Sequence, residues 1–381
     1  MKKQHIQILF LAILWVIYSS CGNNPIKKND VAEANPIIQN ESDELLNFLE
    51  KSGNFLNTSK SPAIIQPQDV FENLDEYLII DLRSHEEYVD GHIDGAKNTS
   101  LEKLLEFLNQ EVIPSAFEKI VLVCNNGQSA SYAAGVLRLI GYGNTYAMKW
   151  GMSGWNKQFA SDYWIKNIGN KATNLDTNLI DKPAKNKMFK YPQIHTGKRT
   201  TFDIAKERAK QILIEGYKKV SIKYDTLMKN PDKFFIINYW TIAEFKQGHL
   251  KNAYQYQPKE SFSKSGFLTT LPTNQPIVVY CFTGHTSAFV VAYLRMLGFD
   301  AYSLSYGTNS FMNAKMISNE IINKAFVANR DIQNYPTIEG EEATIKKEVT
   351  SIATDNSKNQ TKSVEKKDTP KKKKTGGGGG C

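Results

Sequence analysis

A short apolar run that ends in a cysteine and continues into a helix-like segment occurs twice in the chain. The first run leads to Cys124 and the second to Cys281, and a glycine follows three residues after each cysteine. The two cysteines are 157 residues apart, and other landmarks keep this spacing. Gly91 corresponds to Gly248, His92 to His249, Arg138 to Arg295 and Gly141 to Gly298. A fixed offset over about 50 positions indicates one domain duplicated in tandem.

Apolar runs alternate with segments of helical periodicity in each copy, which favours a parallel sheet flanked by helices. We therefore expect an α/β fold with two tandem domains, each a small parallel sheet with helices on its faces. In the first copy the pattern predicts strands at 78–81, 120–123 and 144–147, and helices at 68–73, 101–109 and 128–140.

The first domain is expected at residues 62–168 and the second at 203–328, where a helical pattern at 203–216 opens it. Residues 169–202 between them are polar, contain Pro183 and Pro192 and lack a clear period, which predicts a linker.

Both ends of the chain differ in character from the domains. Residues 22–61 are rich in Asn, Lys, Glu and Ser and predict a tether, within which a short amphipathic helix from Leu45 to Leu56 is expected to dock on the first domain. Residues 329–381 form a Lys-rich segment with few large apolar residues, which predicts a disordered tail. The tail ends in five glycines and Cys381. Three interpretations of this C-terminal sequence are considered: an attachment or processing signal, a remnant for surface coupling, and a mobile thiol that carries sulfur.

The first 21 residues have the pattern of a secretory signal. Lys2 and Lys3 precede an uninterrupted apolar run at 8–18, and small residues then lead to Cys21. The run is shorter than the roughly 20 residues that a membrane-spanning helix needs. This site resembles the lipobox of bacterial lipoproteins, which implies that Cys21 is lipidated and that the protein is anchored in the bacterial cell envelope, on a periplasmic or surface face. The alternative is ordinary signal cleavage that leaves an unmodified thiol.

The two internal cysteines are the candidate nucleophiles. A strand that ends in Cys and runs into a helix places the thiol beside unpaired backbone N–H groups, whose partial positive charge favours an anion. Cysteine reacts as the thiolate, and helix N-termini stabilise that form. Gly127 and Gly284 allow the loop conformations that aim N–H groups inward. The alternative is a structural cysteine at a strand end, since free cysteine is often buried.

The chain resembles the rhodanese-like domains, which share a Cys-x-x-Gly loop between a central strand and a helix. In the first copy, the strand ending in Asp81-Leu-Arg83, the segment from Glu86 to Ala96 with Gly91-His92, and the stretch from Leu139 to Trp155 are similar to the family's motifs. The resemblance implies a parallel sheet with the cysteine loop at the carboxyl end of a central strand. It also implies a sulfurtransferase activity, with Asp81 and Arg83 as supporting residues.

The chain departs from the family pattern at several positions. Many active members carry Arg or Lys within the loop, whereas neither loop here contains a cation, which argues against thiosulfate as the natural donor. Asp81 and Arg83 correspond to Asn238 and Trp240 in the second copy. His285 beside Cys281 is interpreted either as a partial cation or proton carrier, or as an exposed polar loop residue.

Composition limits the partners and cofactors. The chain has 381 residues, a net charge of +8 and four cysteines, Cys21, Cys124, Cys281 and Cys381. The cysteines are not paired within a domain, so a disulfide framework is not expected, and the spacing of Cys and His does not suggest a metal site. The excess Lys lies in the linker and the tail, where solvated, solubilising charge is the default interpretation and contact with anionic lipid or envelope polymers is the alternative. Nucleic-acid binding is not expected. We expect neither a metal nor an organic cofactor. The oligomeric state is left open.

The leading hypothesis is an envelope-anchored sulfurtransferase that moves sulfane sulfur through a cysteine persulfide to a thiol or cyanide acceptor, with Cys124 and Cys281 as nucleophiles. Its partners are a small sulfur donor or a protein thiol acceptor, and the membrane through the lipid anchor. The rival is a rhodanese-fold binding or scaffold lipoprotein without turnover. In the leading hypothesis the persulfide is stabilised by the loop residues Asn125, Asn126, Gly127, Gln128, Ser129 and Ala130 in the first copy, and Phe282, Thr283, Gly284, His285, Thr286 and Ser287 in the second.

Overall fold

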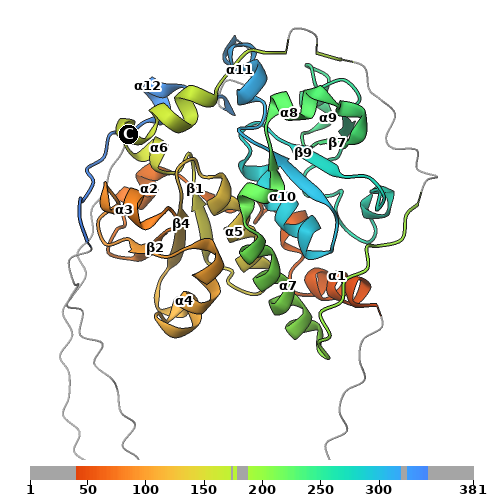
Figure 1. Ribbon diagram of the computed structural model, residues 1–381, viewed down its shortest axis with the longest axis horizontal. Helices are drawn as coiled ribbons and strands as arrows, with labels where there is room; N and C mark the ends of the chain where they lie inside the picture. Colours follow the sequence, from red (N-terminus) through yellow and green to blue (C-terminus); the bar gives the residue numbers. More distant parts are fainter. Residues whose placement is uncertain (1–39, 173–174, 178–187, 319–323, 342–381) are drawn as a thin grey trace, which may run out of the picture. The chain divides into compact units, whose positions relative to one another are not determined.

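The computed structural model describes residues 40–172, 175–177, 188–318 and 324–341. These ranges contain two five-stranded sheets, one in each predicted domain, and all of the pairings within both sheets are parallel. The fold class expected from the repeated pattern is therefore confirmed (Figure 1).

The first sheet has the strand order β1-β5-β4-β2-β3. Every residue of β2 is buried, as are four of the five residues of β4, which explains why these strands read as continuous apolar runs rather than alternating ones. The strands are β1 Ile64–Ile65, β2 Tyr77–Asp81, β3 Lys97–Asn98, β4 Lys119–Val123 and β5 Thr145–Met148. The helices of this domain are α2 Pro67–Phe71, α3 His85–Val89, α4 Leu104–Gln110, α5 Gln128–Leu139 and α6 Met152–Trp155.

The second sheet repeats this topology in the order β6-β10-β9-β7-β8. Its central strand β9 lies between β7 and β10, as β4 lies between β2 and β5 in the first sheet. The strands are β6 Ser221–Ile222, β7 Phe235–Asn238, β8 Tyr254–Gln255, β9 Ile277–Tyr280 and β10 Ala301–Leu304. The helices are α8 Tyr224–Lys229, α9 Ile242–Phe245, α10 His285–Met296 and α11 Asn309–Ser318. The duplication inferred from the offset thus extends to the order of the strands.

The helices that follow the two cysteines pack directly against each other. Gly135 of α5 has so little room beside α10 that an added Cβ would lie 3.1 Å from both Ala292 Cβ and Phe289 Cδ1. Helix α7, Thr201–Glu215, packs against both α5 and α10, and Figure 1 shows the three helices side by side. One hydrophobic cluster runs through α5, α7 and α10, so the two domains share a core.

The N-terminal helix forms as predicted, but it docks at a different place. Helix α1, Glu41–Lys51, buries Leu45, Leu46 and Leu49 and packs on α7. The Asp43 carboxylate accepts from Lys264 Nζ at 2.8 Å, which belongs to the second domain. The predicted docking on the first domain is therefore wrong for α1, which packs on α7 and bonds to the second domain, and the folded chain begins before the predicted boundary at residue 62.

The described part of the predicted linker lies on the second domain. Gly169 donates its N–H to Asn309 O at 2.8 Å and accepts from Asn313 N at 3.0 Å. Further along, Ile194 is buried and approaches Gly298 so closely that an added Cβ there would lie 2.6 Å from its side chain. The described residues of the linker are therefore bonded to and packed on the second domain.

The chain returns to the first domain after α12, Ala328–Asp331. We call residues 332–341 the C-terminal strap. Ile338 forms an antiparallel bridge with His92, with N···O distances of 2.9 Å in both directions. Trp155 Nε1 donates to Pro336 O at 2.8 Å, and Tyr335 stacks on Phe71. The predicted start of the disordered tail at residue 329 is wrong, because the strap is bonded into the first domain.

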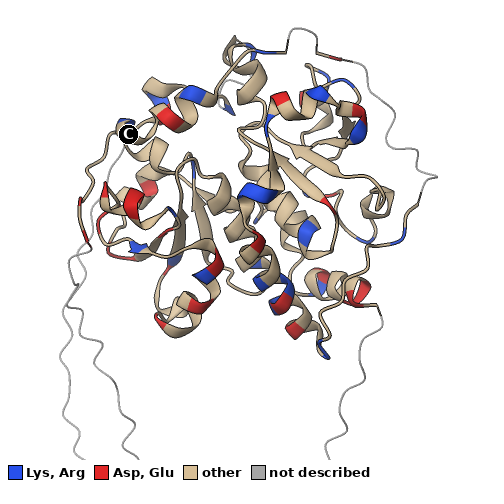
Figure 2. Cartoon of the chain, viewed as in Figure 1, with Lys and Arg blue, Asp and Glu red and all other residues tan. Residues whose placement is uncertain are grey.

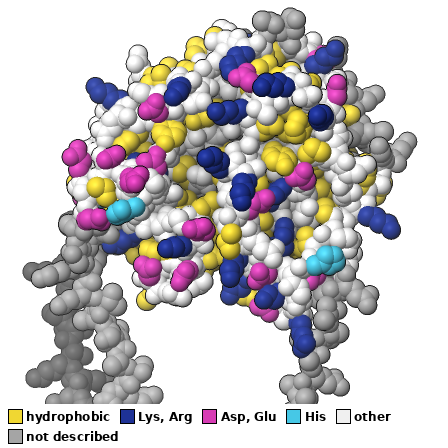
Figure 3. All heavy atoms as spheres, in the orientation of Figure 1, with side chains coloured by type: hydrophobic (Ala, Val, Ile, Leu, Met, Phe, Trp, Pro, Cys, Tyr) yellow, Lys and Arg dark blue, Asp and Glu magenta, His cyan; other side chains and the backbone are white. Residues whose placement is uncertain are grey.

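The remaining terminal predictions fall on 1–39 and 342–381, outside the described residues, and this applies to Cys21 and Cys381 as well. Within the described residues, no helix combines the length and apolar character needed to span a membrane. Residues of both charge signs follow one another along α7 in Figure 2, and acidic and basic side chains are interspersed over the face drawn in Figure 3.

Candidate functional site

Cys124 lies directly after β4, at the start of the first thiol loop, residues 124–130. Its Sγ accepts hydrogen bonds from the backbone N–H groups of Gly127 at 3.2 Å and Ala130 at 3.4 Å. Gly127 has φ = 82°, in the left-handed region that favours glycine, and this turn directs the loop N–H groups toward the sulfur. The thiol is free and only 4% exposed. The expected placement beside a helix N-terminus is therefore present.

Cys281 occupies the same position in the second thiol loop, residues 281–287. Its Sγ accepts from Gly284 N at 3.2 Å and Ser287 N at 3.3 Å, and it lies 3.5 Å from Ser287 Oγ. Ser287 Oγ in turn shares a hydrogen bond with Ser303 Oγ at 2.8 Å. Cys281 is 3% exposed. Each sulfur thus lies against two inward-pointing amide groups, a polar setting that suits an anionic sulfur.

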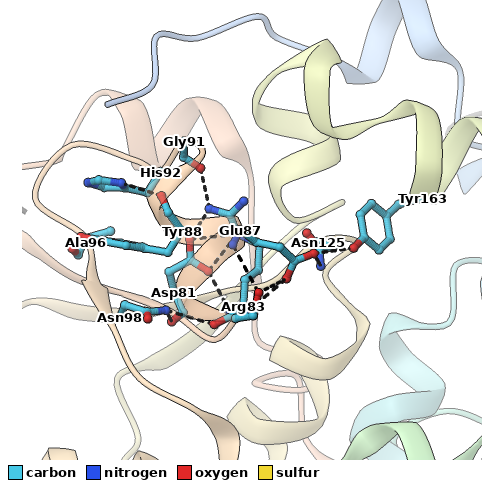
Figure 4. A network of polar contacts seen from close by, with 11 residues as sticks. Asp81, Arg83, Glu87, Tyr88, Gly91, His92, Ala96, Asn98, Asn125 and Tyr163 are labelled. Carbon is cyan, nitrogen blue, oxygen red and sulfur yellow. Dashed lines mark hydrogen bonds and ion pairs between the residues drawn. The ribbon is translucent and has the colours of Figure 1, made fainter. Parts of the chain in front are cut away.

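The asparagines of the first thiol loop hold the loop in place. Asn125 Nδ2 donates to Glu87 Oε1 at 2.8 Å, and Tyr163 OH donates to the same oxygen at 2.6 Å (Figure 4). Burial raises the pKa of Glu87, but the hydrogen bonds from Tyr163 and Asn125 outweigh it and keep this pKa below its usual value. Asn126 Oδ1 accepts from Gln128 N at 3.0 Å. These side chains fix the backbone and do not supply a cation.

Asp81 and Arg83 form a buried ion pair beneath the first thiol loop. Arg83 Nη2 lies 2.6 Å from Asp81 Oδ2 and also donates to Gly91 O at 2.7 Å (Figure 4). The two side chains are each 1% exposed. The pair ties the end of β2 to the turn after α3 and has no contact with Cys124 among the described hydrogen bonds. In this geometry Asp81 and Arg83 support the fold around the loop and do not contact the thiol directly.

The second copy uses aromatic packing where the first has the ion pair. Trp240 stacks on Phe282 with ring centroids 4.2 Å apart and an interplanar angle of 6°. Lys324 Nζ lies 4.3 Å from the centroid of the Phe282 ring on the same loop. The loss of the Asp-x-Arg pattern therefore reflects a different way of supporting the loop, with the thiol geometry retained.

His285 does not act as the cation or proton carrier proposed as one alternative. Its side chain is fully buried, and burial together with the charge of Lys149 lowers the pKa of His285 to about 3. Nε2 accepts a hydrogen bond from Trp150 N, in the first domain, at 3.2 Å. The imidazole is therefore neutral near pH 7, and its hydrogen bond joins it to the first domain, whereas the donors to Cys281 are Gly284 and Ser287. The alternative of an exposed polar loop residue is wrong as well, because the side chain is buried.

A cavity of about 320 Å³ lies over the second thiol loop. Cys281, Phe282, Thr283 and Thr286 line it on the loop side. Three charged residues that sequence reasoning missed also line it: Lys149, Glu244 and Lys324. Lys324 forms an ion pair with Glu244.

The charged groups of the cavity differ in their pKa shifts and in their ion pairing. Burial lowers the pKa of Lys149, against the attraction of Asp331. Burial raises the pKa of Glu244, but hydrogen bonds from Lys324 and Thr241 outweigh it and lower this pKa below its usual value. The cavity therefore offers one neutralised pair and one additional ammonium group, which is suited to a small anion.

These residues leave different signals in the sequence. Lys149 stands beside Trp150-Gly151 in a motif that the sequence shows, but the motif does not indicate that this lysine reaches the other domain. Glu244 is the N3 residue of a capping box whose N-cap is Thr241, which is a local signal for a helix start. Lys324 has no local signal, since only the tertiary fold brings it to Cys281. Groups of Cys, His, Asp and Glu that could hold a metal ion are absent from the described residues.

Comparison with known proteins finds similarity to the rhodanese-like domains. The rhodanese-like domain family matches residues 66–158 and 224–314. The chain is 34% identical over 79 residues to thiosulfate sulfurtransferase GlpE of Shewanella oneidensis, covering 21% of this chain and 75% of the relative. It is 27% identical over 101 residues to GlpE of Pseudoalteromonas translucida, covering 26% and 92%. Among solved structures, a rhodanese-like domain protein from Staphylococcus aureus is 24% identical, covers 24% of this chain and 87% of that chain, and has a TM-score of 0.21.

The buried ion pair gives a stability prediction. Asp81→Asn leaves the Arg83 guanidinium buried without its counter-charge, and we expect a loss of about 3–5 kcal/mol in the free energy of unfolding. Urea unfolding followed by circular dichroism measures it. The double variant Asp81→Asn with Arg83→Met removes the stranded charge and should recover part of this loss. A single variant within about 1 kcal/mol of wild type would contradict a structural role for the pair.

Proposed function

The chain belongs to the rhodanese-like domain family, and from this premise we propose that it is a sulfurtransferase that carries sulfur as a persulfide on the cysteine of a thiol loop. The observation that carries the proposal is the pair of backbone N–H groups directed at each sulfur. Such donors stabilise negative charge on the attacking sulfur and on the terminal sulfur of the product. The named curated relatives are thiosulfate sulfurtransferases, which supports the same reaction class.

The proposed reaction is a double displacement. The cysteine thiolate attacks the outer sulfur of thiosulfate, a new S–S bond forms, the original S–S bond breaks and sulfite leaves with its electron pair. An acceptor thiolate or cyanide then attacks the terminal sulfur of the persulfide, and the cysteine leaves as a thiolate. Electrons and atoms balance without an external oxidant, so the reaction needs neither a metal nor an organic cofactor.

The cavity beside Cys281 supports an anionic donor. The loops themselves lack a cation, but Lys149 and Lys324 line the same cavity as the thiol. Lys324 is paired with Glu244, whereas no ion pair of Lys149 is found among the described residues. Lys149 is therefore the group that we assign to the donor anion, and the second thiol loop is the one that we assign to its binding.

A non-catalytic binding protein remains the second candidate. The exposures of the two cysteines, 4% and 3%, favour it, because a donor must reach a sulfur that is nearly enclosed. A binding protein would keep the loops and the cavity without forming the persulfide.

Intact mass of the full chain separates these candidates. After incubation with thiosulfate or inorganic polysulfide, we expect the gain of one sulfur atom, which peptide mapping assigns to Cys281. Cys281→Ser should abolish this gain, whereas Cys124→Ser should retain most of it. If no donor adds sulfur to either cysteine, the binding protein is the correct description. Addition that only Cys124→Ser abolishes would move the reaction to the first loop.

The cation gives a second prediction. Lys149→Ala should slow sulfur loading from thiosulfate by about tenfold, the equivalent of one charged hydrogen bond. The variant should leave nearly unchanged the reaction of the Cys281 thiolate with an uncharged dialkyl trisulfide, which attaches an alkyl disulfide group to the sulfur and releases an alkyl thiolate. Lys166→Ala serves as the control, because Lys166 is exposed and pairs only with Asp162 in the same turn. Since the pKa of Lys149 is lowered, loading from thiosulfate should also fall as the pH rises through that pKa. Equal effects on both donors would argue against anion binding.

We also propose that the protein is a lipoprotein of the cell envelope, anchored through Cys21. The basic start, the apolar run at 8–18 and the small residues before Cys21 support it. In a bacterial host that processes lipoproteins, the protein should partition into the detergent phase, and Cys21→Ser should shift it to the aqueous phase. Partition of wild type and variant into the same phase would contradict lipidation at Cys21.

A further inference from the structure

The two thiol loops exchange side chains across the domain boundary. Gln128 and His285 are equivalent residues, each directly after the loop glycine and each the first residue of its helix. Gln128 Oε1 accepts from Tyr306 N in the second domain at 2.8 Å. His285 Nε2 accepts from Trp150 N in the first domain at 3.2 Å. Both side chains are fully buried, so each accepts its bond inside the other domain.

The backbone groups that receive these side chains belong to the turns beneath the cysteines. Trp150 and Tyr306 have φ values of 66° and 62°, in the left-handed region that is unfavourable for large side chains. The turn after Trp150 donates Met152 N to Cys124 O at 2.8 Å, and the turn after Tyr306 donates Thr308 N to Cys281 O at 3.0 Å. A side chain that fixes either turn therefore also fixes the peptide of the cysteine above it.

The glycines of both loops are needed for this exchange. An added Cβ at Gly127 would lie 2.3 Å from His285 Nε2, and one at Gly284 would lie 2.4 Å from Gln128 Oε1. Each loop glycine thus supports a left-handed turn and also leaves room for the side chain of the other copy. The imidazole can accept the bond because burial keeps it neutral, with its pKa lowered to about 3.

Two further contacts join the same elements. Asn126 Nδ2 in the first thiol loop donates to Tyr306 OH at 3.1 Å. Tyr217 OH, from the segment after α7, donates to Gln128 Oε1 at 3.3 Å. Gln128 Oε1 therefore has two donors, and Tyr306 is held both at its backbone and at its hydroxyl.

We propose that Gln128 and His285 are positioning residues that act on the opposite domain: His285 orients the loop that carries Cys124, and Gln128 orients the loop that carries Cys281. The proposal builds on the proposed function only in taking these thiols as the reactive groups. It follows that neither copy presents a fully organised thiol loop without the other. A side chain in one half of the repeat thus sets the reactivity of the cysteine in the other half.

The pH dependence of alkylation in the full chain tests this. Iodoacetamide labelling from neutral to alkaline pH, followed by peptide mass spectrometry, gives the pH at which each cysteine reaches half of its maximal labelling rate. A change in access to the sulfur alters the maximal rate but leaves this half-maximal pH unchanged. His285→Phe removes the acceptor of Trp150 N and should raise the half-maximal pH of Cys124 by about 0.7 unit, the equivalent of about fivefold, with little change at Cys281. Gln128→Met, of nearly the same shape, should do the reverse.

A conservative variant completes the test. His285→Gln restores an amide oxygen of the kind that Gln128 uses at the equivalent position, and should bring Cys124 back toward its wild-type profile. Thermal unfolding identifies variants that fail to fold, and His285→Asn, which is polar but too short, then replaces His285→Phe. A shift confined to the cysteine of the mutated domain, equal shifts at both cysteines, or no shift would each overturn the proposal.

The outcome is distinguishable from a failure of the proposed function. Alkylation does not need a sulfur donor, so the crossed pattern can be present in a chain that never forms a persulfide. Conversely, sulfur loading with uncrossed alkylation profiles would support the sulfurtransferase and overturn the role of these two side chains.

Discussion

The close approach of α5 and α10 is the constraint on which the rest of the structure depends. Gly135 and Ala292 are equivalent in the repeat, and they meet each other where an added Cβ on Gly135 would lie 3.1 Å from Ala292 Cβ. Because both helices begin at a thiol loop, bringing the helices together also brings their starts together. At this separation Gln128 and His285 each reach a backbone N–H group of the other domain. The packing of small residues in the middle of two helices thus determines the surroundings of both sulfurs.

Much of this organisation could be predicted from the repeated pattern. The 157-residue offset located both sheets and both loops, and the continuous apolar runs before Cys124 and Cys281 are central strands of parallel sheets, as expected. Local signals were sufficient there, because a strand, a left-handed glycine and a helix start are encoded by neighbouring residues. His285 was misread as a candidate for charge chemistry, since its neighbours in sequence do not reveal that it is enclosed by the other domain. Lys149 and Lys324 were missed for the same reason.

The second copy has lost a sequence motif of the family but has kept the geometry around its thiol. Asn238 and Trp240 replace the buried ion pair, and by sequence this suggests a degenerate domain. The thiol of this copy nevertheless has the same two N–H donors, and aromatic stacking of Trp240 on Phe282 supports its loop. The replacement avoids the desolvation of two buried charges, although the amide of Asn238 is itself buried and polar. The cavity with its two lysines lies over this copy's loop.

Each terminal segment binds the domain that is more distant from it in sequence, and this arrangement bears on the evolution of the protein. Helix α1 precedes the first domain in sequence but bonds to Lys264 in the second, and the C-terminal strap follows the second domain but bonds to His92, Trp155 and Val89 in the first. Neither copy is thus a contiguous stretch that could be excised with all of its own contacts. After a gene duplication, these two exchanged segments make the two domains depend on each other for folding. Neither domain can then be inherited or recombined as a separate unit.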